Sequence, residues 1–179
     1  GMIARLKNFV QEDIWRIRAK GLPPLKAFGI RYLRILLAAA NALSGEPQRR
    51  DYRALPWVIF SDPQVAGVGL NELEAASAGI EVEVARLDLR NVPRALAARD
   101  TRGFIKLIRR KGSDELIGAR ILAPEGGEQI MEAALAIRHG IGVSDLASAF
   151  HPYLTQVEGI KLCAQTFGKD VAKLSCCAG

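Results

Sequence analysis

The most reactive side chains of this sequence gather near its end. Cys176 and Cys177 are adjacent, and Ala178 and Gly179 follow them. Thiolates are soft ligands that prefer soft metal ions such as Hg(II), Cu(I) or Zn(II). Two neighbouring thiols on a terminal tail make a poor structural crosslink, so the pair predicts a site that captures a soft metal ion. The alternative is an incidental thiol pair that is prone to oxidation. A closed zinc site is not expected, because it needs four ligands.

Three other side chains have structural explanations that compete with a chemical role. Cys163 lies beside an apolar stripe with helical spacing, where a thiol is more often a small core residue. His139 precedes Gly140 at the end of a predicted helix, where a cation complements the helix dipole. His151 begins a His-Pro-Tyr turn, and we expect a structural histidine at this position.

The segment from residue 51 to residue 179 predicts a single domain that would position these side chains. Asn71 and Ser144 are expected to cap helices, and the turn at 111–114 predicts a hairpin. The expected strands are 57–60, 65–70, 80–89, 104–108 and 116–122, and the expected helices are 72–78, 128–139, 144–150 and 154–167. Hairpin-linked strands followed by helices are typical of an α+β fold, with an antiparallel sheet covered by helices on one face.

Residues 1–50 form a separate basic arm. They carry ten Lys and Arg residues against three acidic residues, a net charge of +7, whereas residues 51–179 carry −1. Apolar residues at helical spacing over 3–20 and 25–43 predict an N-terminal helical hairpin that does not span a membrane, and 44–51 reads as a linker. Such an arm can dock on the following domain or on a second copy, or attach to an anionic membrane surface. Nucleic acid ranks last, because no known reader motif is present.

Several motifs carry a resemblance to a known family. They are His151-Pro152-Tyr153-Leu154-Thr155, Val157-Glu158-Gly159, Leu174-Ser175-Cys176-Cys177-Ala178-Gly179 and, upstream, Phe60-Ser61-Asp62-Pro63, Val68-Gly69-Leu70-Asn71-Glu72 and Gly103-Phe104-Ile105-Lys106. These motifs resemble the mercuric reductases, a flavin-dependent branch of the pyridine nucleotide-disulfide oxidoreductases. The resemblance covers about residues 54–179 and implies the dimerisation domain of that family. The arm resembles the soluble start of the YihY-type inner-membrane family, in residues 9–17 and 22–36.

The resemblance implies a function for the candidate residues. It implies that Cys176 and Cys177 capture Hg(II), that Tyr153 lies beside the metal in the partner subunit's catalytic pocket, and that the domain forms a homodimer. In the wider family the His-Pro histidine pairs with an acid five residues on. Here that residue is Gln156 and the acid is Glu158, so an acid–base role for His151 is not expected. The bond before Pro152 stays open, because about 5–6% of X-Pro bonds are cis.

The chemistry of the family needs parts that this sequence lacks. Full-length relatives are implied to use FAD and NADPH, but no G-x-G-x-x-G fingerprint and no redox cysteine pair occur here. We therefore expect no catalytic residue, no cofactor-binding residue and no mercury(II) reduction in the isolated chain, which would bind metal and dimerise. One alternative is a subunit that supplies its tail to a flavoprotein encoded elsewhere. Another is a membrane- or partner-binding adaptor that acts through the arm. Free thiols without a secretory signal predict a cytoplasmic protein, with peripheral attachment to the inner membrane as the alternative.

Overall fold

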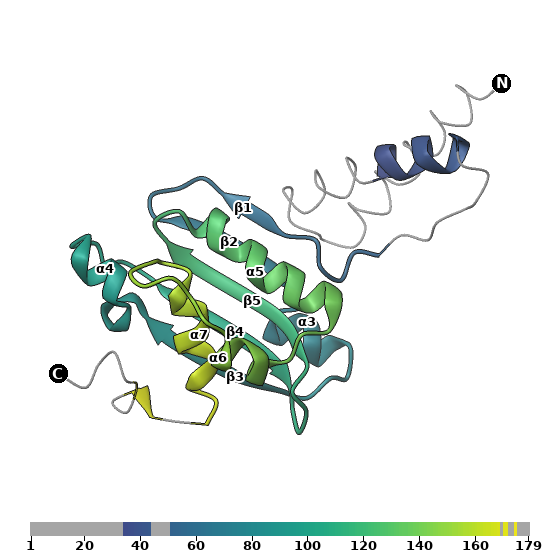
Figure 1. Ribbon diagram of the computed structural model, residues 1–179. Helices are drawn as coiled ribbons and strands as arrows, with labels where there is room; N and C mark the ends of the chain where they lie inside the picture. The colour runs from purple at the N-terminus through teal and green to yellow at the C-terminus, as the bar shows by residue number, and fades with distance from the viewer. Residues whose placement is uncertain (1–33, 44–50, 169, 172–173, 175–179) are drawn as a thin grey trace. The chain divides into compact units, whose positions relative to one another are not determined.

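The computed structural model of the chain describes residues 34–43, 51–168, 170–171 and 174 (Figure 1). The chain divides into two compact units, Gly1–Leu55 and Pro56–Gly179. In the first unit, residues 34–43 form a helix, and Arg34 Nε donates a hydrogen bond to Tyr52 Oη at 3.1 Å. Most of the predicted helical hairpin lies outside the described residues, as do Cys176 and Cys177.

The second unit is built on one antiparallel sheet. Its strands are β1 (Trp57–Ile59), β2 (Gln64–Gly69), β3 (Val82–Asp88), β4 (Phe104–Arg110) and β5 (Leu116–Ala123). They lie in the order β1-β2-β5-β4-β3, and every neighbouring pair is antiparallel. The sheet confirms the α+β class that the sequence predicts. β4 and β5 form the predicted hairpin, in which Gly112 adopts a positive φ of 71°.

The helices of this unit lie mainly on one face of the sheet. They are α3 (Glu72–Ser77), a 3₁₀ turn η1 (Leu89–Asn91), α4 (Pro93–Ala97), α5 (Gly126–His139), α6 (Val143–Ser148) and α7 (Glu158–Gln165). Helix α3 is the exception, because its Ala75 packs with Ile108 and Ile117 on the opposite face. α5 packs against β5, β2 and β1, and α7 packs against β4 and β3 (Figure 1). Strand alternation sends Ile105, Leu107 and Ile121 into this helix-covered core. Their neighbours Lys106 and Arg120 therefore point to the opposite face.

Of the two predicted helix caps, Asn71 is confirmed and Ser144 is not. Asn71 caps α3 as predicted, because its side chain accepts from the Glu74 amide at 2.7 Å and Glu74 accepts from the Asn71 amide at 2.9 Å. The prediction that Ser144 caps α6 is wrong. The cap residue is Gly142, and the Ser144 amide donates instead to the Asp114 carboxylate, at 3.0 and 3.2 Å. Asp114 belongs to the β4–β5 turn, so the hairpin itself satisfies the start of this helix.

The last helix is shorter than predicted. α7 begins at Glu158 rather than at residue 154, and the preceding residues form a turn in which Thr155 Oγ1 donates to the Pro152 carbonyl at 2.8 Å. The cis peptide bonds of the described chain are Asp62–Pro63 and Tyr153–Leu154. The bond before Pro152 is not among them.

Candidate functional site

The candidate residues of the C-terminal region that the structure describes fall on two elements. His151 and Tyr153 lie on the turn between α6 and α7, and Cys163 lies on α7. The structure adds Glu132 of α5, which nothing in the sequence singled out, and the buried Leu174, two positions before the cysteine pair.

His151 is paired with a carboxylate from another helix. Its Nε2 lies 3.0 Å from Oε1 and 3.1 Å from Oε2 of Glu132. Its Nδ1 lies 3.4 Å from the Ala149 carbonyl oxygen. The His151 side chain is only 7% exposed, so it is an anchored residue of the turn, as the sequence predicts. The carboxylate that holds it is Glu132 rather than Glu158, the acid that the sequence offered.

Tyr153 stands out from the same turn into solvent. Its relative exposure is 77%, and Phe150 before it is fully exposed. A purely structural role for this tyrosine, as a half-buried ring at a helix entry, does not fit this exposure. An exposed pair of aromatic rings beside a buried, paired histidine is a surface that can meet another molecule.

Cys163 is a core residue and not a ligand. It has no exposed surface, and its Sγ donates to the backbone carbonyl oxygens of Ala85 and Ile105 at 3.6 and 3.4 Å. Burial raises the pKa of this thiol to about 12. A buried thiol of this kind stays protonated at neutral pH, and the thiolate is the form that binds metal. Cys163 therefore serves as an inert internal control for the two terminal thiols.

The base of the tail is fixed to the domain. Leu174 is 1% exposed and belongs to the hydrophobic core, and the half-buried Val171 packs against the same core. The Leu174 amide donates to the Val171 carbonyl at 3.1 Å. Cys176 follows this anchor by two positions in the sequence. The chain is therefore anchored in the core at Leu174, two positions before the thiol pair in the sequence.

His139 has the structural role that the sequence predicts. It is exposed in the last turn of α5 together with Arg138, and Gly140 ends the helix in the left-handed conformation with φ 67°. Within the described part of the chain, no group of three or more His, Cys, Asp and Glu side chains could hold a metal ion.

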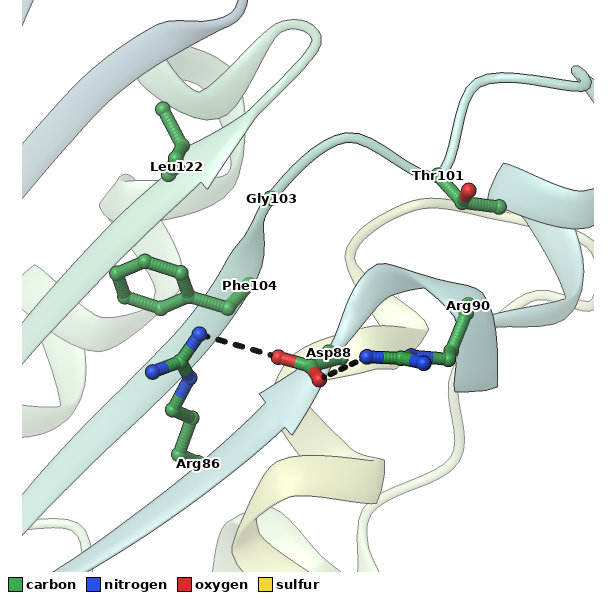
Figure 2. A pocket seen from close by; sticks show the side chains of 7 residues that line it. All are labelled: Arg86, Asp88, Arg90, Thr101, Gly103, Phe104 and Leu122. Carbon is green, nitrogen blue, oxygen red and sulfur yellow. Dashed lines mark hydrogen bonds and ion pairs between the residues drawn. The ribbon is translucent and has the colours of Figure 1, made fainter.

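A cleft lies at the edge of the sheet, away from these residues. Its volume is about 500 Å³, and it is lined by Arg86, Asp88, Arg90, Thr101, Gly103, Phe104 and Leu122 (Figure 2). Figure 2 shows Asp88 between the two arginines, 3.3 Å from Arg86 and 3.0 Å from Arg90. The Arg86 guanidinium also lies 4.2 Å from the centre of the Phe104 ring. Asp88 pairs with both arginines and offsets one of their two positive charges.

Arg120, on the opposite face of the sheet from α5 and α7, stabilises the fold. Arg120 donates to the carbonyl oxygens of Val68 and Gly69 at 2.7 and 3.2 Å, and it lies 3.3 Å from the Glu74 carboxylate. Its guanidinium is 5.8 Å from the centre of the Trp57 ring. Burial lowers the pKa of Arg120, but an arginine remains charged at neutral pH. This side chain joins β2, β5 and the start of α3.

Comparison with known proteins assigns the class of this domain. The family described as "Pyridine nucleotide-disulphide oxidoreductase, dimerisation domain" matches residues 55–164. Solved structures share the fold. LpdA of Mycobacterium tuberculosis superposes with a TM-score of 0.66 at 25% identity, covering 73% of this chain and 28% of that chain. The HOCl-induced flavoprotein disulfide reductase RclA of Escherichia coli superposes with a TM-score of 0.65 at 25% identity, covering 71% and 30%. The chain belongs to the pyridine nucleotide-disulphide oxidoreductase dimerisation-domain family.

Curated relatives confirm the branch that the sequence motifs indicated. The mercuric reductase of Shewanella putrefaciens is 56% identical over 137 residues, which are 76% of this chain and 25% of that protein. The mercuric reductase of Serratia marcescens is 60% identical over 118 residues, and that of Staphylococcus aureus is 45% identical over 143 residues. The chain spans about a quarter of the length of these relatives. Among the described residues, no helix is both long and apolar enough to cross a lipid bilayer.

Proposed function

We propose that this chain is the dimerising and Hg(II)-capturing domain of a mercuric reductase-like flavoprotein. The observation that carries the proposal is the 45–60% identity to mercuric reductases over most of the chain, on a dimerisation-domain fold. In this role the domain binds a second copy and presents Cys176 and Cys177 to the metal ion. Hg(II) is the substrate of such an enzyme and would pass from these thiolates to the catalytic centre of the assembled dimer.

The chemistry of capture is thiolate exchange on a soft cation. Each incoming thiolate displaces one already bound, so the metal can move between cysteine pairs without being released. The anchor at Leu174 supports this role, because it ties a short reactive tail to a rigid body. FAD and NADPH would supply the electrons, and we assign their binding to the parts of such enzymes outside this domain, since no G-x-G-x-x-G fingerprint occurs here.

Helix α5 offers a surface for the second copy. Met131 and Leu135 stand on its outer side with 46% and 49% of their surface exposed, and the exposed Phe150 and Tyr153 follow on the α6–α7 turn. A two-fold dimer uses the same patch on both subunits. Membership of a dimerisation-domain family supports a homodimer, and these side chains are the apolar residues that we propose to be buried in it.

An anaerobic Hg(II) titration of the reduced protein tests metal capture. We expect one Hg(II) per chain to bind tightly, and the double substitution Cys176→Ala and Cys177→Ala to remove that binding. Cys163→Ser is the matched control, because it removes the third thiol while keeping a hydroxyl that can donate to the same two carbonyl oxygens. Unchanged stoichiometry and affinity in the double variant would contradict the proposal.

A further inference from the structure

The carboxylate of Glu132 determines which nitrogen of His151 carries a proton. Both oxygens of Glu132 lie within 3.1 Å of Nε2, and an ionised carboxylate only accepts hydrogen bonds. The proton must therefore sit on Nε2. We propose that Glu132 is a positioning residue, which fixes the tautomer of His151 and thereby holds the turn with Phe150 and Tyr153 against α5.

The second ring nitrogen faces a weaker acceptor than the Glu132 carboxylate. Nδ1 faces the Ala149 carbonyl oxygen at 3.4 Å, and a carbonyl oxygen also only accepts. A neutral imidazole donates from one nitrogen, so it satisfies the Glu132 contact and leaves Nδ1 without a donor hydrogen. An imidazolium satisfies both contacts, and the Glu132 hydrogen bond is charge-assisted in both states because its acceptor is ionised. In either state the Nε2–H bond to Glu132 is the stronger of the two.

The His151 side chain is buried between exposed neighbours on this turn. Phe150 and Tyr153 are exposed on either side of it, whereas the His151 side chain is 7% exposed. The hydrogen bond from Thr155 Oγ1 to the Pro152 carbonyl and the contact of His151 Nδ1 with the Ala149 carbonyl both stay within this segment. The contact with Glu132 is thus the side-chain hydrogen bond that ties the described turn to α5.

The consequence for metal transfer rests on the proposed function. If Tyr153 meets the metal in a partner subunit, its position depends on how firmly the turn is held. Glu132 acts on this position through His151 and does not touch the metal. α5 also carries the exposed Met131 and Leu135, so the same helix would hold the turn and face the second copy.

Nitrogen NMR of the two histidine side chains tests the assignment. His139 is exposed and supplies an internal reference. In the wild-type protein, we expect the signals of His151 to show a proton on Nε2. Glu132→Ala should shift the proton toward Nδ1, because the Ala149 carbonyl oxygen is then the remaining acceptor, whereas Glu132→Gln should retain the wild-type tautomer, because the amide oxygen still accepts from Nε2. Glu128→Gln, an exposed acid one turn earlier on α5, is the control. Wild-type signals in Glu132→Ala, or an equal change in Glu128→Gln, would overturn the proposal.

Hydrogen exchange measures whether the turn is held. Loss of a charge-assisted hydrogen bond should speed exchange of the backbone amides of 153–157 by about tenfold or more in Glu132→Ala, with β4 unchanged. Equal exchange in wild-type and Glu132→Ala protein would overturn the positioning role. Hg(II) affinity should be the same in both, because the tail thiols bind the metal. Absence of Hg(II) binding in wild-type protein would contradict the proposed function and leave the hydrogen-exchange result valid.

Discussion

Leu174 is the residue whose substitution most directly tests the anchor of the tail. It is 1% exposed and packs in the core two positions before Cys176. Truncation of a fully buried leucine to alanine removes apolar contacts and leaves a cavity, at a cost of about 2–5 kcal/mol. Leu174 lies outside the strands and helices of the domain, so its detachment does not require the sheet to unfold. A cost of about 2 kcal/mol then raises the open population of the tail about 30-fold.

Limited trypsin digestion measures this opening. Lys169 and Lys173 lie in the segment around the anchor, and cleavage of a rapidly opening segment follows the open population. We expect Leu174→Ala to be cut there about 30-fold faster than the wild-type protein. Leu73→Ala is the matched control, since Leu73 is 80% exposed on α3 and its truncation should change little. Equal cleavage rates in Leu174→Ala and Leu73→Ala would refute the anchor.

Three further predictions test the fold around the site. Asp114→Ala should lower the free energy of unfolding, measured by urea denaturation, by about 1 kcal/mol, because it removes the acceptor for the amide and hydroxyl of Ser144. Asp114→Asn should retain most of this stability. Only two of the three thiols of the folded, reduced chain should react rapidly with a thiol reagent at neutral pH, because burial raises the pKa of Cys163 to about 12. Rapid reaction of all three thiols without denaturant would contradict the burial of Cys163. Gly69→Ala and Gly79→Ala both place alanine at a positive φ, which costs about 1–2 kcal/mol. Only at Gly69 would the added Cβ overlap a backbone carbonyl oxygen, so its melting temperature should fall further than that of the Gly79 variant.

The sequence predicted those parts of the fold that depend on neighbouring residues. Asn71 and Glu74 are three positions apart, and their reciprocal hydrogen bonds form as expected. Strand alternation and the turn around Gly112 gave the antiparallel sheet, because each strand pairs through a pattern of period two. The buried position of Cys163 followed from the helical spacing of its apolar neighbours.

The sequence could not predict contacts made between distant elements. Asp114 meets Ser144 from a hairpin 30 positions away, so the local pattern favoured the wrong cap. Glu132 meets His151 across 19 positions, and nothing near His151 indicated it. The arginine cleft at Asp88 likewise depends on how β3 and β4 lie side by side. The predicted start of α7 at Leu154 is four residues too early. Leu154 fits the apolar stripe of the helix, but the chain still forms a turn at that residue.

The central claim is that Hg(II) binds to the terminal thiol pair, and alkylation after metal loading measures it most directly. The reduced protein is given one equivalent of Hg(II), unfolded, treated with a thiol-alkylating reagent and digested with trypsin. Cleavage after Lys173 and Lys161 places Cys176 and Cys177 in one peptide and Cys163 in another. The account predicts that the terminal peptide is protected and the Cys163 peptide is fully alkylated. Alkylation of the terminal pair to the level found without metal would contradict it.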